Sequence, residues 1–193
     1  AAAASRGAVP LVDRPLPRGK GEVSLSLFAF LFSETVQYCQ QRCDNIGELE
    51  TKLEEIGMHA GHRMLELLVW RDKAMKRETR VLGILSFVHT NVWRCLFGRT
   101  ADSLEKGTAA EDEYMISDNN LLVNRFISVP KDMGSLNCGA YVAGVVKGVL
   151  VGAGFPANVT AHFVDVEDSD QQKTVILIKF AAEVLEREQR LGA

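Results

Sequence analysis

Apolar residues recur every three or four positions along residues 23–43, which predicts a helix with more than one apolar side. The main stripe consists of Leu25, Phe28, Phe32, Thr35 and Cys39, and a second apolar edge consists of Leu27, Leu31 and Tyr38. A surface helix needs only one apolar stripe facing its own core. A helix this widely apolar is either central in the fold or covered on two sides, and another protein chain is one candidate cover.

Two further helices are predicted before the first strand. Asn45 is suited to cap the second helix, with Glu48 three residues later in a variant of the capping box. The third helix covers residues 81–97 and ends at Gly98, the residue type that favours a left-handed cap. The apolar face of the second helix consists of Leu49, Leu53, Ile56, Ala60, Met64 and Leu67.

The remaining pattern predicts two strand pairs separated by a helix. Residues 114–117 and 121–129 form the first pair around a turn at 118–120, after a charged loop at 99–113. Strands at 159–166 and 174–180 form the second pair around an acidic turn at 167–170, and a charged helix at 183–190 follows. The order α-α-α-β-β-α-β-β-α predicts an α+β fold in which helices pack on a four-stranded antiparallel sheet.

Small residues recur at every fourth position of the helix predicted at residues 137–151 and at its end, namely Ala140, Gly144, Gly148 and Gly152. Residues four apart lie above one another on a helix, so they form a bare stripe. Each internal glycine costs about 1 kcal/mol relative to alanine. We therefore predict that the sheet or an earlier helix approaches this backbone closely, as Gly57 and Gly61 also indicate for the second helix.

Composition describes an ordinary globular chain. Its 193 residues are 47% hydrophobic and 24% charged, which predicts one domain at 22–193 after a proline-containing flexible arm at 1–21. The net charge of −3 gives no overall attraction to nucleic acid. The lack of a secretory pattern and of an uninterrupted apolar run of about 18 residues predicts a soluble intracellular protein with reduced cysteines.

Candidate chemistry is sparse, and we predict neither a catalytic centre nor a cofactor. The glycine pattern at 152–157 resembles a dinucleotide fingerprint, but it ends a predicted helix instead of following a strand. His59 and His62 share a helix with Glu55 and Glu66, yet no further ligand completes a metal site. A cluster of cations is either a solvated helix end or a patch for anionic lipid or an acidic partner, and consists of Lys73, Lys76, Arg77 and Arg80.

Several short motifs together resemble one protein family. They are Val23-Ser24-Leu25-Ser26, Arg77-Glu78-Thr79, Leu96-Phe97-Gly98, Ile127-Ser128-Val129-Pro130-Lys131, Leu136-Asn137-Cys138, Gly154-Phe155-Pro156-Ala157 and Val159-Thr160-Ala161-His162. In this order and spacing the chain resembles the small subunits of the TRAPP (transport protein particle) tethering complex, most closely the subunit-five branch. The resemblance covers residues 22–189.

The resemblance implies an α/β plait that pairs with other TRAPP subunits through its first helices. The candidate subunit interface consists of Leu25, Phe28, Phe32, Leu49, Leu53 and Ile56. It also implies a non-catalytic scaffold within a complex that exchanges nucleotide on a Rab-type GTPase at cis-Golgi and endoplasmic reticulum membranes. Acylated relatives carry a cysteine about four residues before Arg-Glu-Thr, where this chain has Lys73, so no thioester is expected.

The alternative interpretation is a small-molecule or haem sensor, because ligand-binding domains of such sensors resemble the same plait. A haem sensor needs an axial ligand. His89 in the third predicted helix is the candidate for that role.

Overall fold

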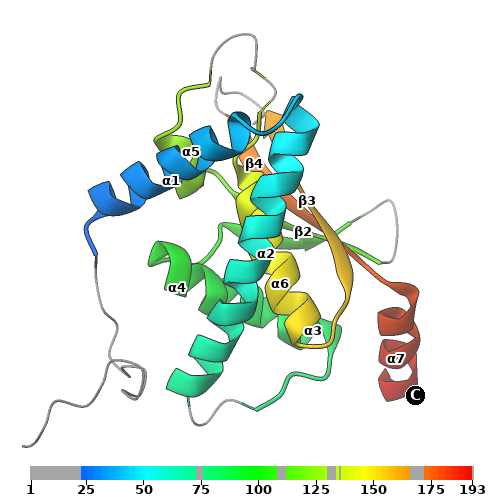
Figure 1. The fold of residues 1–193 in the computed structure, drawn as a ribbon. Coiled ribbons are helices and arrows are strands. Elements are labelled where there is room, and N and C mark those ends of the chain that lie inside the picture. The colour runs from blue at the N-terminus through cyan, green and yellow to red at the C-terminus, as the bar shows by residue number, and fades with distance from the viewer. Residues whose placement is uncertain are drawn as a thin grey trace, which may run out of the picture.

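The computed structural model describes residues 23–72, 76–107, 112–129, 134, 136–165 and 172–192. Helices and strands follow one another in the predicted order, with the short helix α5 added between the second strand and α6 (Figure 1). They are α1 (Leu25–Gln40), α2 (Ile46–Arg71), α3 (Val81–Phe87), the π-helix η2 (Val88–Val92), α4 (Trp93–Phe97), β1 (Ser103–Lys106), β2 (Glu113–Asp118), α5 (Leu122–Arg125), α6 (Gly139–Gly152), β3 (Ala157–Asp165), β4 (Gln172–Phe180) and α7 (Ala182–Gly192).

The four strands form one antiparallel sheet in the order β1-β2-β4-β3. Helix α6 packs against β3 and β4, and α2 packs against α6, so α6 lies between α2 and the sheet (Figure 1). The predicted α+β plait is therefore confirmed. Ten residues of α6 are buried, which agrees with its position in the middle layer.

Capping residues explain where α2 begins and where α4 ends. Asn45 Oδ1 accepts a hydrogen bond from the Glu48 N–H at 2.9 Å, and Glu48 Oε2 accepts one from the Asp44 N–H at 3.0 Å. This confirms the predicted capping-box variant, shifted by one residue on its return bond. Gly98 has φ of 75°, which confirms the left-handed cap that ends α4.

The glycine stripe is the contact between α2 and α6. A Cβ atom on Gly144 would collide with the carbonyl oxygen of Glu54, and one on Gly148 would collide with that of Met58. In the opposite direction, a Cβ on Gly57 or Gly61 would collide with α6 carbonyls. The predicted close approach is confirmed, and the partner is the second helix. At these four glycines the two backbones meet with no side chain between them, whereas at Gly152 the side chains of Leu65 and His62 face α6.

Of the first predicted strand pair, the strand at 114–117 is confirmed as part of β2, and the strand at 121–129 was predicted wrongly. Residues 121–129 contain the short helix α5, and the partner of β2 is β1, which lies in the stretch predicted as a loop. Strand β1 lies at the sheet edge, and its residues are half-buried or exposed. A strand in this position needs no alternation of apolar residues, and β1 has none. Leu121 and Val123 are buried because they pack into the core beside α6, and Asn124 Nδ2 donates to Thr174 Oγ1 at 3.1 Å.

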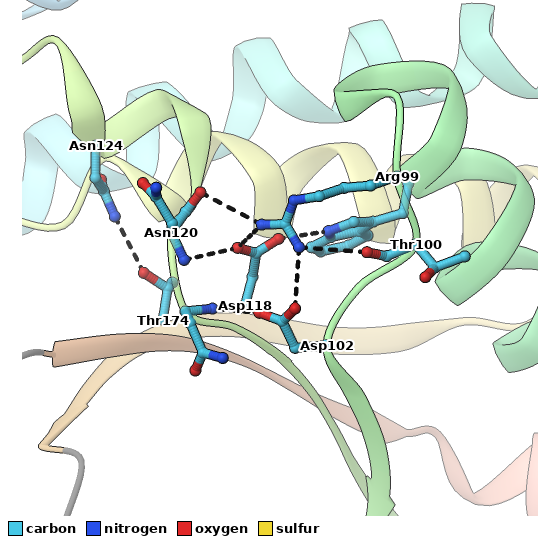
Figure 2. A network of polar contacts seen from close by, with 9 residues as sticks. Arg99, Thr100, Asp102, Asp118, Asn120, Asn124 and Thr174 are labelled. Atoms are coloured by element: carbon cyan, nitrogen blue, oxygen red, sulfur yellow. Dashed lines mark hydrogen bonds and ion pairs between the residues drawn. The ribbon is translucent and has the colours of Figure 1, made fainter.

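A buried carboxylate connects the third helical segment to β2. Asp118 is 1% exposed and accepts hydrogen bonds from Trp93 Nε1 at 2.8 Å and from the Asn120 N–H at 3.0 Å. Arg99 pairs with the same carboxylate, and Asp102 accepts from Arg99 on its exposed side (Figure 2). Because the carboxylate has hydrogen-bonding partners on both oxygens, its burial is tolerated.

We expect Asp118→Asn to lower the free energy of unfolding by about 2 kcal/mol. The amide of asparagine has one acceptor oxygen, and an NH₂ group replaces the other oxygen. Either Trp93 or Arg99, both of which are donors, would then face this NH₂ group and lose its hydrogen bond. Arg99 is exposed enough to regain water, which limits the loss. Urea denaturation measures the change. The control is Asp102→Asn, at a carboxylate on the surface, which should cost less than about 1 kcal/mol. Equal losses in the two variants would contradict the role given to Asp118.

The C-terminal helix α7 is fastened to the start of α3 by Glu188. Its carboxylate accepts hydrogen bonds from Arg80 Nε at 2.8 Å and from the Val81 N–H at 3.0 Å. Val81 is the first residue of α3, so its N–H has no partner within that helix. Burial alone raises the pKa of Glu188, but these two hydrogen bonds and the charges of Arg80 and Arg187 outweigh burial. The pKa is therefore lowered from its ordinary value.

A lowered pKa means that Glu188 stabilises the fold above pH 4.5, its ordinary value, and that this contribution is lost as the pH falls through the folded-state pKa. We expect Glu188→Gln to cost about 1 kcal/mol at pH 7, or roughly 2–4 °C in melting temperature. The difference from the parent chain should shrink below pH 4.5. Glu186→Gln is the control, since the carboxylate of Glu186 is exposed and pairs with the exposed Arg190 of the same helix. A pH-independent difference would contradict this assignment.

Candidate interaction surface

Within the described part of the chain, helix α1 is held to the rest of the fold by its inner side. Ser24 caps it, accepting the Leu27 N–H on its hydroxyl at 3.2 Å. Phe32, Val36 and Cys39 are buried on the inner side, where Phe32 packs edge-to-face against Tyr141 of α6 with ring centroids 5.3 Å apart. Figure 1 shows α1 at the periphery of the molecule, extending away from α2.

The outer side of α1 is exposed and carries four large apolar residues. Phe30 is 76% exposed, Leu31 is 60% exposed and Tyr38 is 55% exposed, and Leu27 continues the same side. These positions are spaced by three, four and seven residues, so they share one helix face. We call Leu27, Phe30, Leu31 and Tyr38 the outer face of α1. Exposed Glu34 lies between Leu31 and Tyr38 on the same face, so the face is mainly but not wholly apolar. Single exposed apolar residues are common, but four large ones grouped on one helix face are typical of an interaction site.

An apolar groove adjoins this helix at its beginning. It has a volume of about 280 Å³ and lies where α1, α4, α5 and α6 meet. Leu25 and Phe28 form one wall, and Leu96, Leu122 and Val145 form the others. Leu25 lies exposed at the rim of the groove. Phe28 is half-buried and stacks on Phe32, with ring centroids 5.7 Å apart. The groove extends the apolar surface of α1 toward α4 and α5.

The structure divides the predicted subunit interface into exposed and buried residues. Leu25 and Ile56 are exposed and Phe28 is half-buried, so these three remain candidates. Leu49 and Leu53 are fully buried and belong to the core of this chain, and Phe32 is buried as well. Their assignment to an interface surface is therefore corrected. The pattern on α2 was misassigned because Leu49 and Leu53 lie on the same side as Gly57, which packs on α6.

Sequence reasoning missed the most exposed apolar residue of α1. Phe30 lies outside both apolar edges that the residue spacing predicts. Its large aromatic side chain is the one signal in the sequence that points to it. The decisive information is which side of α1 faces α6, and the sequence does not give it. Once Phe32 and Val36 are known to face inward, Phe30 and Leu31 must face outward.

The predicted basic patch is only partly described. Lys76, Arg77 and Arg80 are exposed, and Lys73 lies outside the described residues. Arg80 is bound to Glu188, which shows that it has a structural role. Lys76 and Arg77 border an apolar cavity of about 460 Å³ between α2, α3 and the end of α6. The patch stays a prediction, as do the arm at 1–21 and the acidic turn at 167–170, which also lie outside the described residues.

The described residues offer no cluster for metal chemistry. Among them, no group of three or more His, Cys, Asp and Glu side chains is arranged to hold an ion. His89, the candidate axial ligand of the sensor interpretation, lies in η2 and is half-buried. Cys39 and Cys138 are buried thiols, and burial raises the pKa of Cys138 to about 11, so this thiol is a poor nucleophile. No helix of the described chain is long and apolar enough to cross a bilayer.

Comparison with known proteins gives the family of this chain. A family model described as transport protein particle (TRAPP) component matches residues 28–181. The chain belongs to the TRAPP family. This TRAPP chain is 61% identical over 183 residues to trafficking protein particle complex subunit 5 of Dictyostelium discoideum, covering 95% of this chain and 98% of that protein. The predicted family, including its subunit-five branch, is confirmed.

Two further comparisons agree with the fold and the branch. The TRAPP chain is 46% identical over 187 residues to subunit 5 of Gallus gallus, covering 97% of this chain and 96% of the relative. A crystal structure of subunit 3 from Naegleria fowleri, covalently bound to palmitic acid, superposes with a TM-score of 0.67 at 16% identity. That likeness covers 80% of this chain and 95% of the other, and it supports the fold alone.

Proposed function

We propose that this chain is a structural scaffold subunit of the TRAPP vesicle-tethering complex and that it joins its neighbours through the outer face of α1. Relatives that match almost the whole chain are named as subunits of the trafficking protein particle complex. The observation that carries the proposal is the exposed apolar face formed by Leu27, Phe30, Leu31 and Tyr38. Burying these side chains against a partner would remove roughly 1.5–3 kcal/mol of unfavourable hydration for each large residue.

The finer role of the complex follows from the family resemblance. We infer that the assembled particle catalyses guanine-nucleotide exchange on a Rab-type GTPase in transport between the endoplasmic reticulum and the Golgi. This subunit then acts in the cytoplasm, peripherally at those membranes, and without exchange residues of its own. Its contribution is geometric, because a rigid α2–α6 pair holds α1 in place through Phe32 and Tyr141.

Co-purification tests the proposal. The full chain carries a tag, is expressed in cells that contain the other TRAPP subunits, and is recovered at physiological salt for mass spectrometry. The proposal predicts stoichiometric recovery of other TRAPP subunits and elution from gel filtration in a particle larger than one chain. A monomeric chain that recovers no TRAPP subunit contradicts it.

The exchange role has a separate readout. Release of a fluorescent guanine nucleotide from candidate Rab-type GTPases is measured with the purified particle and with this chain alone. We expect acceleration by the particle and none by the isolated chain. Acceleration by the isolated chain would show that it carries exchange residues and would contradict the scaffold assignment.

A further inference from the structure

A second surface lies between the first half of α2 and the edge strand β3, above α6. A groove of about 360 Å³ has the first half of α2 as one wall, β3 as the other and α6 as its floor. In Figure 1, α2 and β3 lie on either side of α6. The floor is formed by the small residues Ala140 and Ala143, so the groove is open above them.

One wall of this groove is an edge of the sheet. Strand β3 is last in the order β1-β2-β4-β3 and pairs with β4 on one side. Five consecutive residues, from Val159 to Phe163, line the groove. Successive side chains of a strand point to opposite faces, so a groove that contacts all five follows the backbone itself. Within the described part of the chain no strand pairs with this edge. Val159 is fully buried, so the part of the edge that can accept a further strand begins at Thr160 and continues through exposed His162 and Phe163.

The opposite wall carries two carboxylates. Glu50 and Glu54 line the groove from α2, and its described lining includes no lysine or arginine. Both carboxylates are positioned by the floor: Glu54 pairs with Lys147 Nζ at 2.6 Å, and Glu50 accepts the Asn137 N–H at 2.9 Å. A carboxylate has about four acceptor sites, so each keeps the capacity to bind a cation from an incoming chain.

The spacing of the carboxylates fits an extended chain. Residues four apart on a helix are separated by about 6 Å along its axis. Alternate residues of a strand are separated by roughly 6.6 Å and point to the same side. Side chains at alternate positions of a strand beside β3 would therefore reach Glu50 and Glu54 in turn.

We propose that the groove between α2 and β3 binds an extended peptide, which adds to β3 as a further strand and directs lysine or arginine side chains from alternate positions to Glu50 and Glu54. Backbone hydrogen bonds supply the affinity that does not depend on sequence, and the two carboxylates select for basic residues. The proposal is independent of the pairing through α1, because the groove uses no residue of the outer face of α1.

Fluorescence anisotropy with the full chain tests the proposal. The probe is a labelled octapeptide of alternating lysine and valine, and the comparison peptide has the same residues in blocks of two. Alternating glutamate and valine gives the charge-reversed peptide. We expect binding of the alternating lysine peptide, at least about threefold weaker binding of the blocked peptide, and no binding of the glutamate peptide. N-methylation of alternate backbone amides should abolish binding in one of the two registers.

Variants of α2 locate the site. Glu50→Gln keeps an oxygen for the Asn137 N–H and removes the charge, so binding should weaken about two- to fivefold. Glu55→Gln removes an exposed carboxylate outside the groove lining and should leave binding unchanged. Amide hydrogen exchange adds a readout of the backbone: bound peptide should slow exchange in Val159–Phe163 and leave β1 unaffected.

Three results would overturn the proposal. Equal binding of the alternating and blocked peptides would reduce the interaction to general charge attraction. Equal weakening by Glu50→Gln and Glu55→Gln would place the peptide elsewhere. Slow exchange of the outer β3 amides in the free chain would mean that another segment of this chain, or a second copy, already occupies the edge.

Discussion

Phe30→Asp is expected to abolish recovery of other TRAPP subunits with the tagged chain while leaving its melting temperature within a few degrees of the parent value. Phe30 contacts solvent over most of its surface, so the folded chain loses little packing. In an assembly, the new carboxylate would be buried against an apolar partner without a counter-charge. Such a group costs several kcal/mol, and even about 1.4 kcal/mol reduces affinity tenfold. The measurement is quantitative mass spectrometry of the recovered subunits.

The matched control is Leu82→Asp on α3. Leu82 is 65% exposed and apolar, so the substitution makes the same chemical change at a surface away from α1. Recovery of partners should be unchanged. If Phe30→Asp retains its partners, or if both variants lose them equally, the outer face of α1 is not the interface. If Phe30→Asp lowers the melting temperature by more than about 10 °C, the loss of partners would result from damage to the fold, and Phe30 would be a structural residue.

Gly148→Leu is expected to destabilise the chain by about 3 kcal/mol or more, which corresponds to roughly 6–12 °C in melting temperature. Its Cβ alone would collide with the Met58 carbonyl, and Gly61 Cα lies beside it, 3.1 Å from where a Gly148 Cβ would stand. Backbone atoms cannot rotate away as a side chain can. Helices α2 and α6 must therefore separate, and α6 is the layer that joins α2 to the sheet. Differential scanning fluorimetry measures the shift.

Gly47→Leu is the control for the stripe. Gly47 is an exposed glycine in the first turn of α2, and a Cβ there meets only Asn45 Oδ1 at 3.4 Å. We expect the free energy of unfolding to change by no more than about 1 kcal/mol, because leucine meets no obstacle there and replaces a glycine that is itself unfavourable in a helix. A Gly148→Leu variant that melts with the parent chain would contradict the close-packed interface between α2 and α6.

The sequence was sufficient for those parts of the fold that local chemistry determines. Asn45 with Glu48 predicted the start of α2, and Gly98 predicted the end of α4. The glycine stripe predicted a close approach because glycine inside a helix is unfavourable without such a reason. Which neighbour approaches was left open, since it depends on how distant segments are layered. The structure identifies α2, through Gly57 and Gly61.

Tertiary contacts decided the elements that were predicted wrongly. Strand β1 has no apolar alternation and forms because β2 offers it a partner, with Leu104 opposite Ile116. The segment at 121–129 alternates like a strand, yet β2 already has β1 and β4 on its two sides. Residues 122–125 therefore turn into α5 and bury Val123 in the core. Pattern alone could not exclude the strand.

The sequence places the candidate interface on α1 but does not tell which side of that helix is exposed. Two apolar stripes on one helix left the inward and outward sides open. Packing of Phe32 on Tyr141 settles this, because it fixes the rotation of α1 about its axis. For α2, the side chosen from the pattern faces α6, so Leu49 and Leu53 moved from the interface to the core. Ile56 stays exposed on that helix.

Photo-crosslinking from position 30 in the assembled particle tests directly whether the outer face of α1 contacts another subunit. Benzoyl-phenylalanine replaces Phe30 in the tagged full chain, and the same residue replaces Leu82 in a parallel sample. After illumination, mass spectrometry identifies the joined peptides. We expect position 30 to crosslink to another TRAPP subunit and position 82 not to give that crosslink. A particle that contains the tagged chain but gives no crosslink from position 30 to another subunit would contradict assembly through the outer face of α1.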